Sequence, residues 1–199
     1  MSTILNLSHN ELSSLLKLAL QGLFQHSQDW GDLAKHILWL ETHGFAGVAS
    51  MKEALESTTF RGFDGDISKT PNGLCIDFNN NSLLMGLPML VDLVTAMAAK
   101  EEHCYISLIN VHDFEAVVSV DAALRAQGLD VYVDANEMTI SSQSDGTNIL
   151  FDFAGAHECY DQSLRDGIPM DQEMYQFLDN LAKRTLVEAT EESRRGAGE

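Results

Sequence analysis

The sequence predicts an α+β fold, in which a helical N-terminal section packs on a mixed sheet with βαβ connectivity and a C-terminal helix follows. Two observations carry this prediction. Apolar residues recur at helical spacing over 8–57, and apolar segments of strand length and helix length alternate from residue 74 onward. Hydrophobic residues make up 45% of the 199, which is enough for an ordinary core. We therefore expect a single domain over 1–199, with a helical section at 1–57 and a mixed α/β section at 74–195.

The helical section opens with a capping-box pattern, Ser8 followed three positions later by Glu11. The apolar residues behind it keep the spacing of one buried helical face: Leu12, Leu15, Leu16, Ala19, Leu20 and Leu23. A second helix is predicted from Trp30 to Thr42, because Gly44 follows it and glycine readily ends helices. Its inward residues are Leu33, Ala34, Ile37 and Leu40. A short third helix is expected near 50–56.

Glycine and proline mark residues 58–73 as a connection without regular structure. A strand follows in which Leu74, Ile76 and Phe78 alternate, and the asparagines at 79–81 predict a turn. A helix ending near Lys100 comes next, with Leu87, Leu90, Val91, Val94 and Ala98 inward. Residues 104–110 then form an apolar strand. A strand, a helix of this length and another strand make a βαβ unit, so part of the sheet should be parallel.

A further helix and strand are expected before the sheet turns antiparallel. The helix carries Phe114, Val117, Val120 and Leu124, and Gly128 closes it; the strand carries Leu129, Val131 and Val133. Met138 and Ile140 alternate with polar residues, Asp145 and Gly146 predict a hairpin turn, and the return strand holds Ile149, Phe151 and Phe153. Residues 154–170 are expected to be a loop. Asp171 is the predicted cap of the last helix, whose inward residues are Met174, Leu178, Leu181 and Thr185.

The charge balance excludes whole classes of partner. Asp and Glu total 30 against 12 Lys and Arg, a formal net charge of −18. Such a chain repels nucleic-acid phosphate and anionic membrane surfaces, so neither is an expected partner. The only basic doublets, at 183–184 and 194–195, stand near the end of the last helix and complement its dipole.

The three cysteines indicate a reducing compartment. Cys75, Cys104 and Cys159 match no zinc or redox spacing, and the first two lie in apolar runs that predict buried free thiols. The N-terminus carries no secretory pattern, and no apolar run is long enough to span a bilayer. We expect a cytoplasmic protein.

Two groups of titratable residues are candidate sites, and each has a purely structural alternative. His36 and His43 lie two helical turns apart with Trp39 between them, which suits a pocket with a titratable pair or, alternatively, one surface and one helix-end histidine. His112, Asp113 and Glu115 follow a strand and open a helix. Strand ends of parallel sheets bind ligands, but acidic residues also suit a helix N-terminus on electrostatic grounds alone.

No metal site or cofactor is expected. Asp64, Asp66 and Ser68 begin like a calcium loop, but Lys69 and Cys75 stand where the loop needs its glycine and its bidentate glutamate. His157, Glu158, Cys159 and Asp161 cluster without a second ligand set elsewhere. Phosphate-binding loops and the Gly-x-Ser-x-Gly elbow are absent, which disfavours ATP hydrolysis and serine-hydrolase chemistry.

The first quarter of the chain resembles short, uncharacterised bacterial proteins. The residues that carry this resemblance are Leu7, Ser8, Asn10, Glu11, Leu12, Trp30, Gly31, Ala34, Trp39, Leu40, Glu41, Gly44 and Gly47. The resemblance implies no activity.

A fainter resemblance is to the type-2 malate/lactate dehydrogenases, whose pattern is Ser-His-Gly-x-x-Arg and later Asn-x-His-Phe-Gly-Ala. In this sequence Thr42 to Gly47 correspond to the first pattern, and Asn110 to Ala116 correspond to the second. The resemblance implies a nicotinamide-dependent fold unlike the Rossmann one, with His43 as a catalytic or substrate-contacting candidate. Gly47 replaces the family's arginine, which removes the clamp for a substrate carboxylate, and aligning Phe114 puts Asp113 rather than His112 at the family's histidine position.

Three hypotheses for function follow. The leading one is a small cytoplasmic binding or accessory protein, with a homodimer or a protein partner left open. The second is a diverged, shortened relative of a nicotinamide-dependent 2-hydroxy-acid oxidoreductase, in which His43, His112 and Asp113 line a cleft between the helices and the sheet. The third is a structural subunit of a larger complex.

Overall fold

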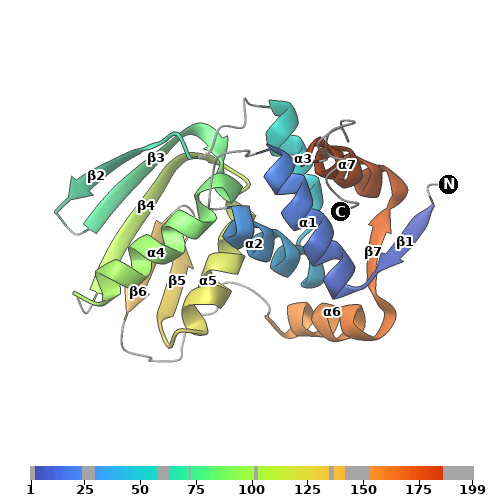
Figure 1. The fold of residues 1–199 in the computed structure, drawn as a ribbon. Helices are drawn as coiled ribbons and strands as arrows, with labels where there is room; N and C mark the ends of the chain where they lie inside the picture. The colour runs from blue at the N-terminus through green and yellow to red at the C-terminus, as the bar shows by residue number, and fades with distance from the viewer. Residues whose placement is uncertain are drawn as a thin grey trace, which may run out of the picture.

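The structure, a computed structural model, describes residues 3–23, 30–57, 63–71, 73–100, 103–134, 137–141 and 153–185, with backbone only at 103–104, 130–134, 137–141 and 153–154. The α-helices are α1 (His9–Leu23), α2 (Trp30–Thr42), α3 (Gly47–Ser57), α4 (Leu87–Ala98), α5 (Val117–Arg125), α6 (Phe153–Asp166) and α7 (Gln172–Ala182). The strands are β1 (Ile4–Leu7), β2 (Asp66–Thr70), β3 (Gly73–Ser82), β4 (His103–His112), β5 (Asp130–Asp134), β6 (Glu137–Ser141) and β7 (Ile168–Asp171). Short 3-10 helices are η1 (Leu83–Gly86), η2 (Phe114–Ala116) and η3 (Lys183–Thr185). This is the predicted α+β fold (Figure 1).

The main sheet has the strand order β2-β3-β4-β6-β5 and is mixed. β3 and β4 pair in parallel, with Ile76 opposite Leu108, and α4 connects them. The predicted βαβ unit is therefore confirmed. β6 pairs antiparallel with both β4 and β5. The sequence predicted antiparallel pairing at this point, but with a return strand at 149–153, and residues 142–152 lie outside the described part of the chain. Helices α4 and α5 lie on the same face of this sheet (Figure 1).

The helical section packs beside the sheet, and its predicted inward faces are confirmed. Leu12, Leu16, Ala19 and Leu20 of α1 and all four predicted residues of α2 are buried. The other two predicted residues of α1, Leu15 and Leu23, are half-buried and pack against the core. The capping box also forms: the Ser8 N–H donates to Glu11 Oε2 at 2.7 Å, and the Glu11 N–H donates to Ser8 Oγ at 3.2 Å. The hydrogen bonds with the backbone and side chain of Ser8 lower the pKa of the Glu11 carboxyl group. α3 starts at Gly47, three residues earlier than the sequence predicted.

A second, two-stranded sheet joins the two ends of the described chain. β1 pairs antiparallel with β7, with Leu5 opposite Met170. Alongside this pair, α1 packs on α7, and Gly22 makes the contact close because a Cβ there would lie 2.1 Å from the Leu181 carbonyl oxygen. The helical section is therefore completed by the end of the chain, a link that local sequence patterns did not predict.

The expected loop over 154–170 is wrong, because the segment forms α6 and β7. The buried positions of α6 are Ala156 and Ser163, with Tyr160 half-buried between them. These residues keep helical spacing but are small or polar, so a search for large apolar side chains does not find the helix. Phe153, expected in a strand, begins α6.

The expected turn at 79–81 is also wrong, because β3 continues through it to Ser82. Asn79 and Asn80 have φ of 51° and 60°, and the register with β4 shifts between Asp77 and Asn81. Asparagine tolerates this left-handed conformation, so the same residues that suit a turn here form a bulge. The predicted connection over 58–73 contains β2, whose side chains are all exposed.

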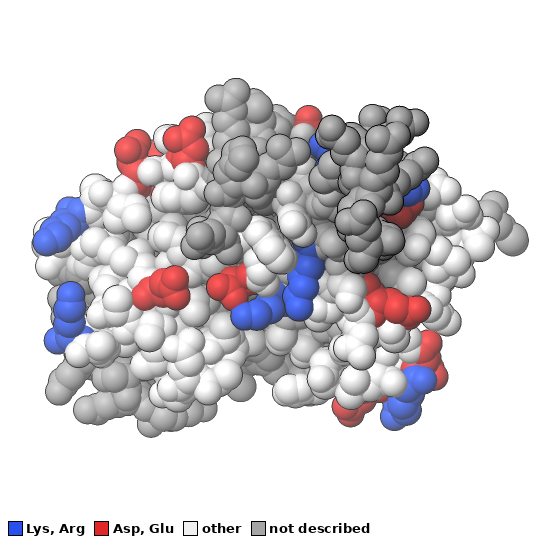
Figure 2. Space-filling view, viewed as in Figure 1, with Lys and Arg blue, Asp and Glu red and all other residues white. Residues whose placement is uncertain are grey.

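Several expectations fall outside the described residues, namely the hairpin at Asp145 and Gly146, the strand residues Ile149 and Phe151, and the doublet Arg194–Arg195. Within the described ranges, no helix combines the length and the apolar composition that crossing a membrane requires. On the face seen in Figure 2, the described Lys and Arg side chains lie singly or in small groups among acidic and uncharged surface.

Candidate functional site

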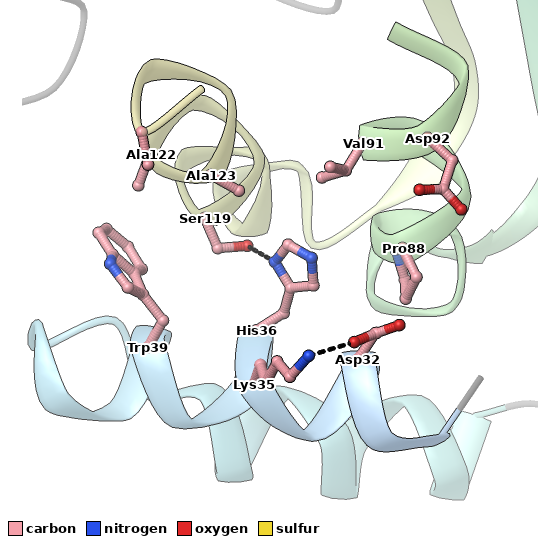
Figure 3. Close-up of a pocket in the computed structure, with 11 residues that line it drawn as sticks. Asp32, Lys35, His36, Trp39, Pro88, Val91, Asp92, Ser119, Ala122 and Ala123 are labelled. Atoms are coloured by element: carbon pink, nitrogen blue, oxygen red, sulfur yellow. Dashed lines mark hydrogen bonds and ion pairs between the residues drawn. The ribbon is translucent and has the colours of Figure 1, made fainter. Parts of the chain in front are cut away.

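A pocket of about 420 Å³ lies where α2 faces α4 and α5 (Figure 3). Its lining residues are Asp32, Lys35, His36 and Trp39 from α2, Pro88, Val91 and Asp92 from α4, and Ser119, Ala122, Ala123 and Ala126 from α5. The four α2 residues share one face because their three- and four-residue spacing matches the helical period. The small alanines of α5 leave the space that the pocket occupies.

His36 is the polar centre of this pocket. The side chain is 9% exposed, and its Nδ1 lies 3.1 Å from Ser119 Oγ. The Ser119 hydroxyl donates its single proton to the Ala116 carbonyl oxygen at 2.8 Å. The contact with His36 is therefore made by Nδ1–H donating to Ser119 Oγ, and this fixes the tautomer in which Nε2 carries no proton.

The ring of His36 is neutral at physiological pH. Burial lowers its pKa from 6.5 to about 4, and nearby Asp32 and Lys35 shift it in opposite directions by smaller amounts. Figure 3 shows the second ring nitrogen directed into the space beside Pro88 and Val91. No described residue bonds to this nitrogen, so the pocket presents a buried hydrogen-bond acceptor with no protein partner.

Charged groups occupy the rim of the pocket. Lys35 Nζ pairs with Asp32 Oδ1 at 2.6 Å, and both side chains are mostly exposed. Asp92, exposed on α4, forms no ion pair within the described part of the chain. With two carboxylates against one ammonium group, the pocket mouth carries a net negative charge.

His43 lies apart from this pocket, in a stack of aromatic rings. Its ring stacks on Trp39 at 3.9 Å and on Tyr160 of α6 at 4.9 Å, and its Nδ1 donates to the Trp39 carbonyl oxygen at 2.8 Å. Desolvation is the main cause that lowers its pKa, and His157 and His9 add to it. The structure thus buries both His36 and His43, so His36 is not the surface residue of the structural alternative. The structure does not place His36 and His43 in the same pocket.

A second, smaller pocket of about 270 Å³ adjoins this stack, between the end of α2, α6 and β7. Thr42 and Ser163 line it, and both hydroxyls are already bonded: Thr42 to the Trp39 carbonyl and Ser163 to the Tyr160 carbonyl. Glu41 accepts from the Val48 N–H at 2.8 Å, and burial raises its pKa. The buried hydroxyls of this pocket have no free bonding capacity comparable to that of His36.

His112 and Asp113 lie at the end of β4, among residues with unusual backbone conformations. Asp113 has a φ of 57° and accepts a hydrogen bond from Ser82 Oγ at 2.6 Å, whereas His112 is exposed. Nearby, Asn110 donates to both carboxylate oxygens of Asp77 at 3.0 and 3.1 Å. The contacts of the described residues join none of this group to His43, so no direct contact brings together the three residues of the oxidoreductase hypothesis, His43, His112 and Asp113.

The residues that the sequence analysis weighed as metal ligands do not come together at one point in the structure. Asp66 and Ser68 lie in β2, an extended strand rather than a loop, and His157 and Cys159 are exposed on α6. Within the described ranges, no group of three or more His, Cys, Asp or Glu side chains is arranged to hold a metal ion. Cys75 is half-buried rather than buried, and the Cys104 side chain lies outside the description.

Ser119 lines the pocket and contacts His36, and sequence patterns did not single it out. It lies 83 positions after His36, in the middle of an apolar helical pattern, and no local motif marks it. A buried serine between valines at 118 and 120 is the one clue that the sequence contained.

The fold is similar to that of solved structures named as dehydrogenases, among them malate dehydrogenases. The chain is similar in structure to a dehydrogenase from Sinorhizobium meliloti (TM-score 0.65, 10% identity, 90% of this chain and 100% of that one) and to malate dehydrogenase from Pyrococcus horikoshii OT3 (TM-score 0.65, 9% identity, 94% and 98%). A protein described as a malate/lactate dehydrogenase from E. coli is also similar (TM-score 0.68, 8% identity, 96% and 98%). No curated protein sequence matches the chain.

The chain itself belongs to the DUF3726 family, described as proteins of unknown function, which it matches over residues 7–123. This match includes α2, α4 and most of α5, and therefore nearly all of the residues that line the pocket around His36.

Proposed function

We propose that this protein is a small-molecule binding protein that uses the pocket between α2, α4 and α5. The observation that carries the proposal is the buried Nε2 of His36, an acceptor that faces a 420 Å³ space and has no partner among the described residues. A donor on a bound molecule would replace water at this nitrogen, with a net gain of about 0.5–1.5 kcal/mol for one hydrogen bond. Apolar walls with a few polar groups are typical of ligand pockets.

Indole and phenol are suitable first probes, because each combines a ring of modest size with one hydrogen-bond donor. In nitrogen–proton spectra of the labelled protein, either probe at about 1 mM should shift the side-chain resonance of Trp39 but not that of Trp30. Ala123→Phe fills the pocket and should abolish the shift. Ala49→Phe, at an exposed position on α3, is the matched control. If neither probe moves Trp39, or if Ala123→Phe binds equally well, the proposed function is wrong.

A second candidate function, a diverged nicotinamide-dependent oxidoreductase, is favoured by the similarity in fold to malate/lactate dehydrogenases. In that case His43, His112 and Asp113 would be the residues to test. Stabilisation by NADH or NADPH together with malate or lactate in a thermal-unfolding assay would support it, provided that His43→Gln removes the effect. Unfolding temperatures that do not change with any cofactor would count against it.

We further propose a cytoplasmic location. Cys75 and Cys159 are free thiols, and such thiols persist in reducing compartments. Fractionation of cells that produce the tagged protein tests this directly.

A further inference from the structure

We propose that the ligand of the pocket around His36 is an uncharged or cationic molecule with a compact apolar body and one N–H or O–H donor, and that anionic ligands are rejected. This inference rests on the proposed function and adds the chemical class of the ligand. Three features of the pocket support it: the fixed tautomer of His36, the apolar walls and the charges at the rim.

The tautomer determines which kind of hydrogen bond the ligand must make. Because Ser119 Oγ gives its proton to Ala116, it can only accept from His36, and Nδ1 of the ring must be the protonated nitrogen. Nε2 then has a lone pair and no proton. A ligand with only acceptor groups at this point would leave two lone pairs facing each other, so a donor is required.

The walls determine the body of the ligand. Val91, Ala122 and Ala123 contribute aliphatic carbon, and Trp39 contributes the edge of an indole ring. Figure 3 shows these side chains on opposite sides of the space into which His36 points. A compact apolar ring or short chain would bury its surface against them, whereas an extended polar molecule would lose its hydration without compensation.

The rim determines the charge of the ligand. Asp32 and Asp92 flank the mouth with one basic residue, Lys35, which is already paired with Asp32. His36 supplies no positive charge at neutral pH. The whole chain carries a net charge of −18, so the surrounding field also repels anions. Phosphate or carboxylate ligands therefore meet no unpaired cation here.

Four related compounds test the hydrogen-bond donor and the charge of the ligand separately: indole, 1-methylindole, tryptamine and indole-3-acetate. Replacing the indole N–H by a methyl group removes the donor and should weaken binding about five- to tenfold, the effect of one hydrogen bond. Tryptamine should bind at least about tenfold more tightly than indole-3-acetate at low salt, and added salt should reduce this ratio. Dissociation constants come from titrations followed at the Trp39 resonance.

Two variants test the assigned residues through ratios rather than absolute affinities. His36→Leu should bring the indole to 1-methylindole ratio to about one, whereas His112→Leu, at an exposed site, should leave it unchanged. Asp92→Asn should reduce the preference for tryptamine, whereas Asp161→Asn on α6 should not. Because each ratio compares two ligands of the same variant, a general loss of stability does not imitate the result.

The tautomer has a readout that does not depend on binding. Long-range nitrogen–proton spectra of the histidine rings should show Nδ1 of His36 protonated and Nε2 unprotonated at about pH 7. If indole binds but 1-methylindole binds equally well, or if indole-3-acetate binds as tightly as tryptamine, this inference is wrong while the proposed function stands. If none of the four compounds binds, the proposed function fails as well.

Discussion

For His36, the sequence predicts the helical face on which the residue lies but not the protonation of its ring. The spacing of Asp32, Lys35, His36 and Trp39 places them on one face of a helix, and that much was predictable. The neutral state of the ring was not, because it comes from burial between helices that are distant in the sequence, and the tautomer depends on Ser119 in one of them. Tertiary contacts of this kind turn an ordinary helical histidine into a fixed acceptor.

The lowered pKa of His36 predicts that the protein loses stability in mild acid. The unfolded chain binds a proton with a pKa near 6.5, whereas the folded protein binds it only near 4. The unfolded state therefore holds more protons between these values, and stability falls as the pH drops from about 6.5 to about 4. Between about pH 7.5 and about pH 5 the expected loss from this residue is about 2 kcal/mol.

Denaturant unfolding of the wild type and of His36→Gln at both pH values measures this contribution. The variant lacks the titrating ring, so its stability should decrease less. His112→Gln, in which an exposed histidine is removed, should follow the wild type. The other charged groups near His36 are Asp32 and Lys35 on α2 and Asp92 on α4, and all three are present in the wild type and in His36→Gln alike. Equal pH dependence in the wild type and His36→Gln would contradict the prediction.

At the scale of elements, the sequence predicted the helices and strands that have large apolar faces. The helices α1 and α2 and the βαβ unit β3-α4-β4 follow from spacing alone, because each buries leucine, isoleucine or valine at the period of its structure. α6 was missed because its buried face is made of Ala156, Tyr160 and Ser163. The continuation of β3 was missed because a bulge and a turn use the same residue type at 79–81.

The contact between α1 and α7 gives a prediction about Gly22. A methyl group there would meet the Leu181 carbonyl oxygen at 2.1 Å, so Gly22→Ala must move the two helices apart. We expect a loss of about 1–3 kcal/mol in the free energy of unfolding, as is usual for overpacked sites.

Gly31 provides the matched control, because a Cβ at that position in α2 would meet nothing within 4 Å. Gly31→Ala should raise the free energy of unfolding by up to about 1 kcal/mol, since alanine is the better helix former. Opposite signs for these two glycine substitutions in urea titrations are the expected result. A stabilising Gly22→Ala would show that the helices pack less closely than described.

At the scale of the whole molecule, the excess of acidic residues should make stability depend on salt. With a net charge of −18, mutual repulsion opposes compaction, and salt screens that repulsion. Salt also weakens ion pairs such as Lys35–Asp32, but this pair is exposed and contributes little. We expect the melting temperature to rise between about 20 mM and about 300 mM NaCl, where the Debye length shortens several-fold.

A variant with fewer charges tests the cause of this effect. Replacing the exposed Glu53, Glu158, Asp161 and Asp166 by their amides removes four negative charges without touching the pocket around His36. This variant should melt at a higher temperature than the wild type in low salt and gain less from added NaCl. A melting temperature that falls with salt in both proteins would refute the explanation.

The pairing of β1 with β7 has a consequence for how the protein is made. Translation produces β1 and α1 well before β7, which pairs with β1, and α7, which packs on α1. Until α7 has been made, the leucine side chains of α1 that it covers therefore stay exposed to solvent. Exposed apolar surface of this kind favours binding to chaperones and aggregation. Nascent chains arrested before residue 168 should remain open to protease within the first helix, even though the segment matched by the family has already emerged.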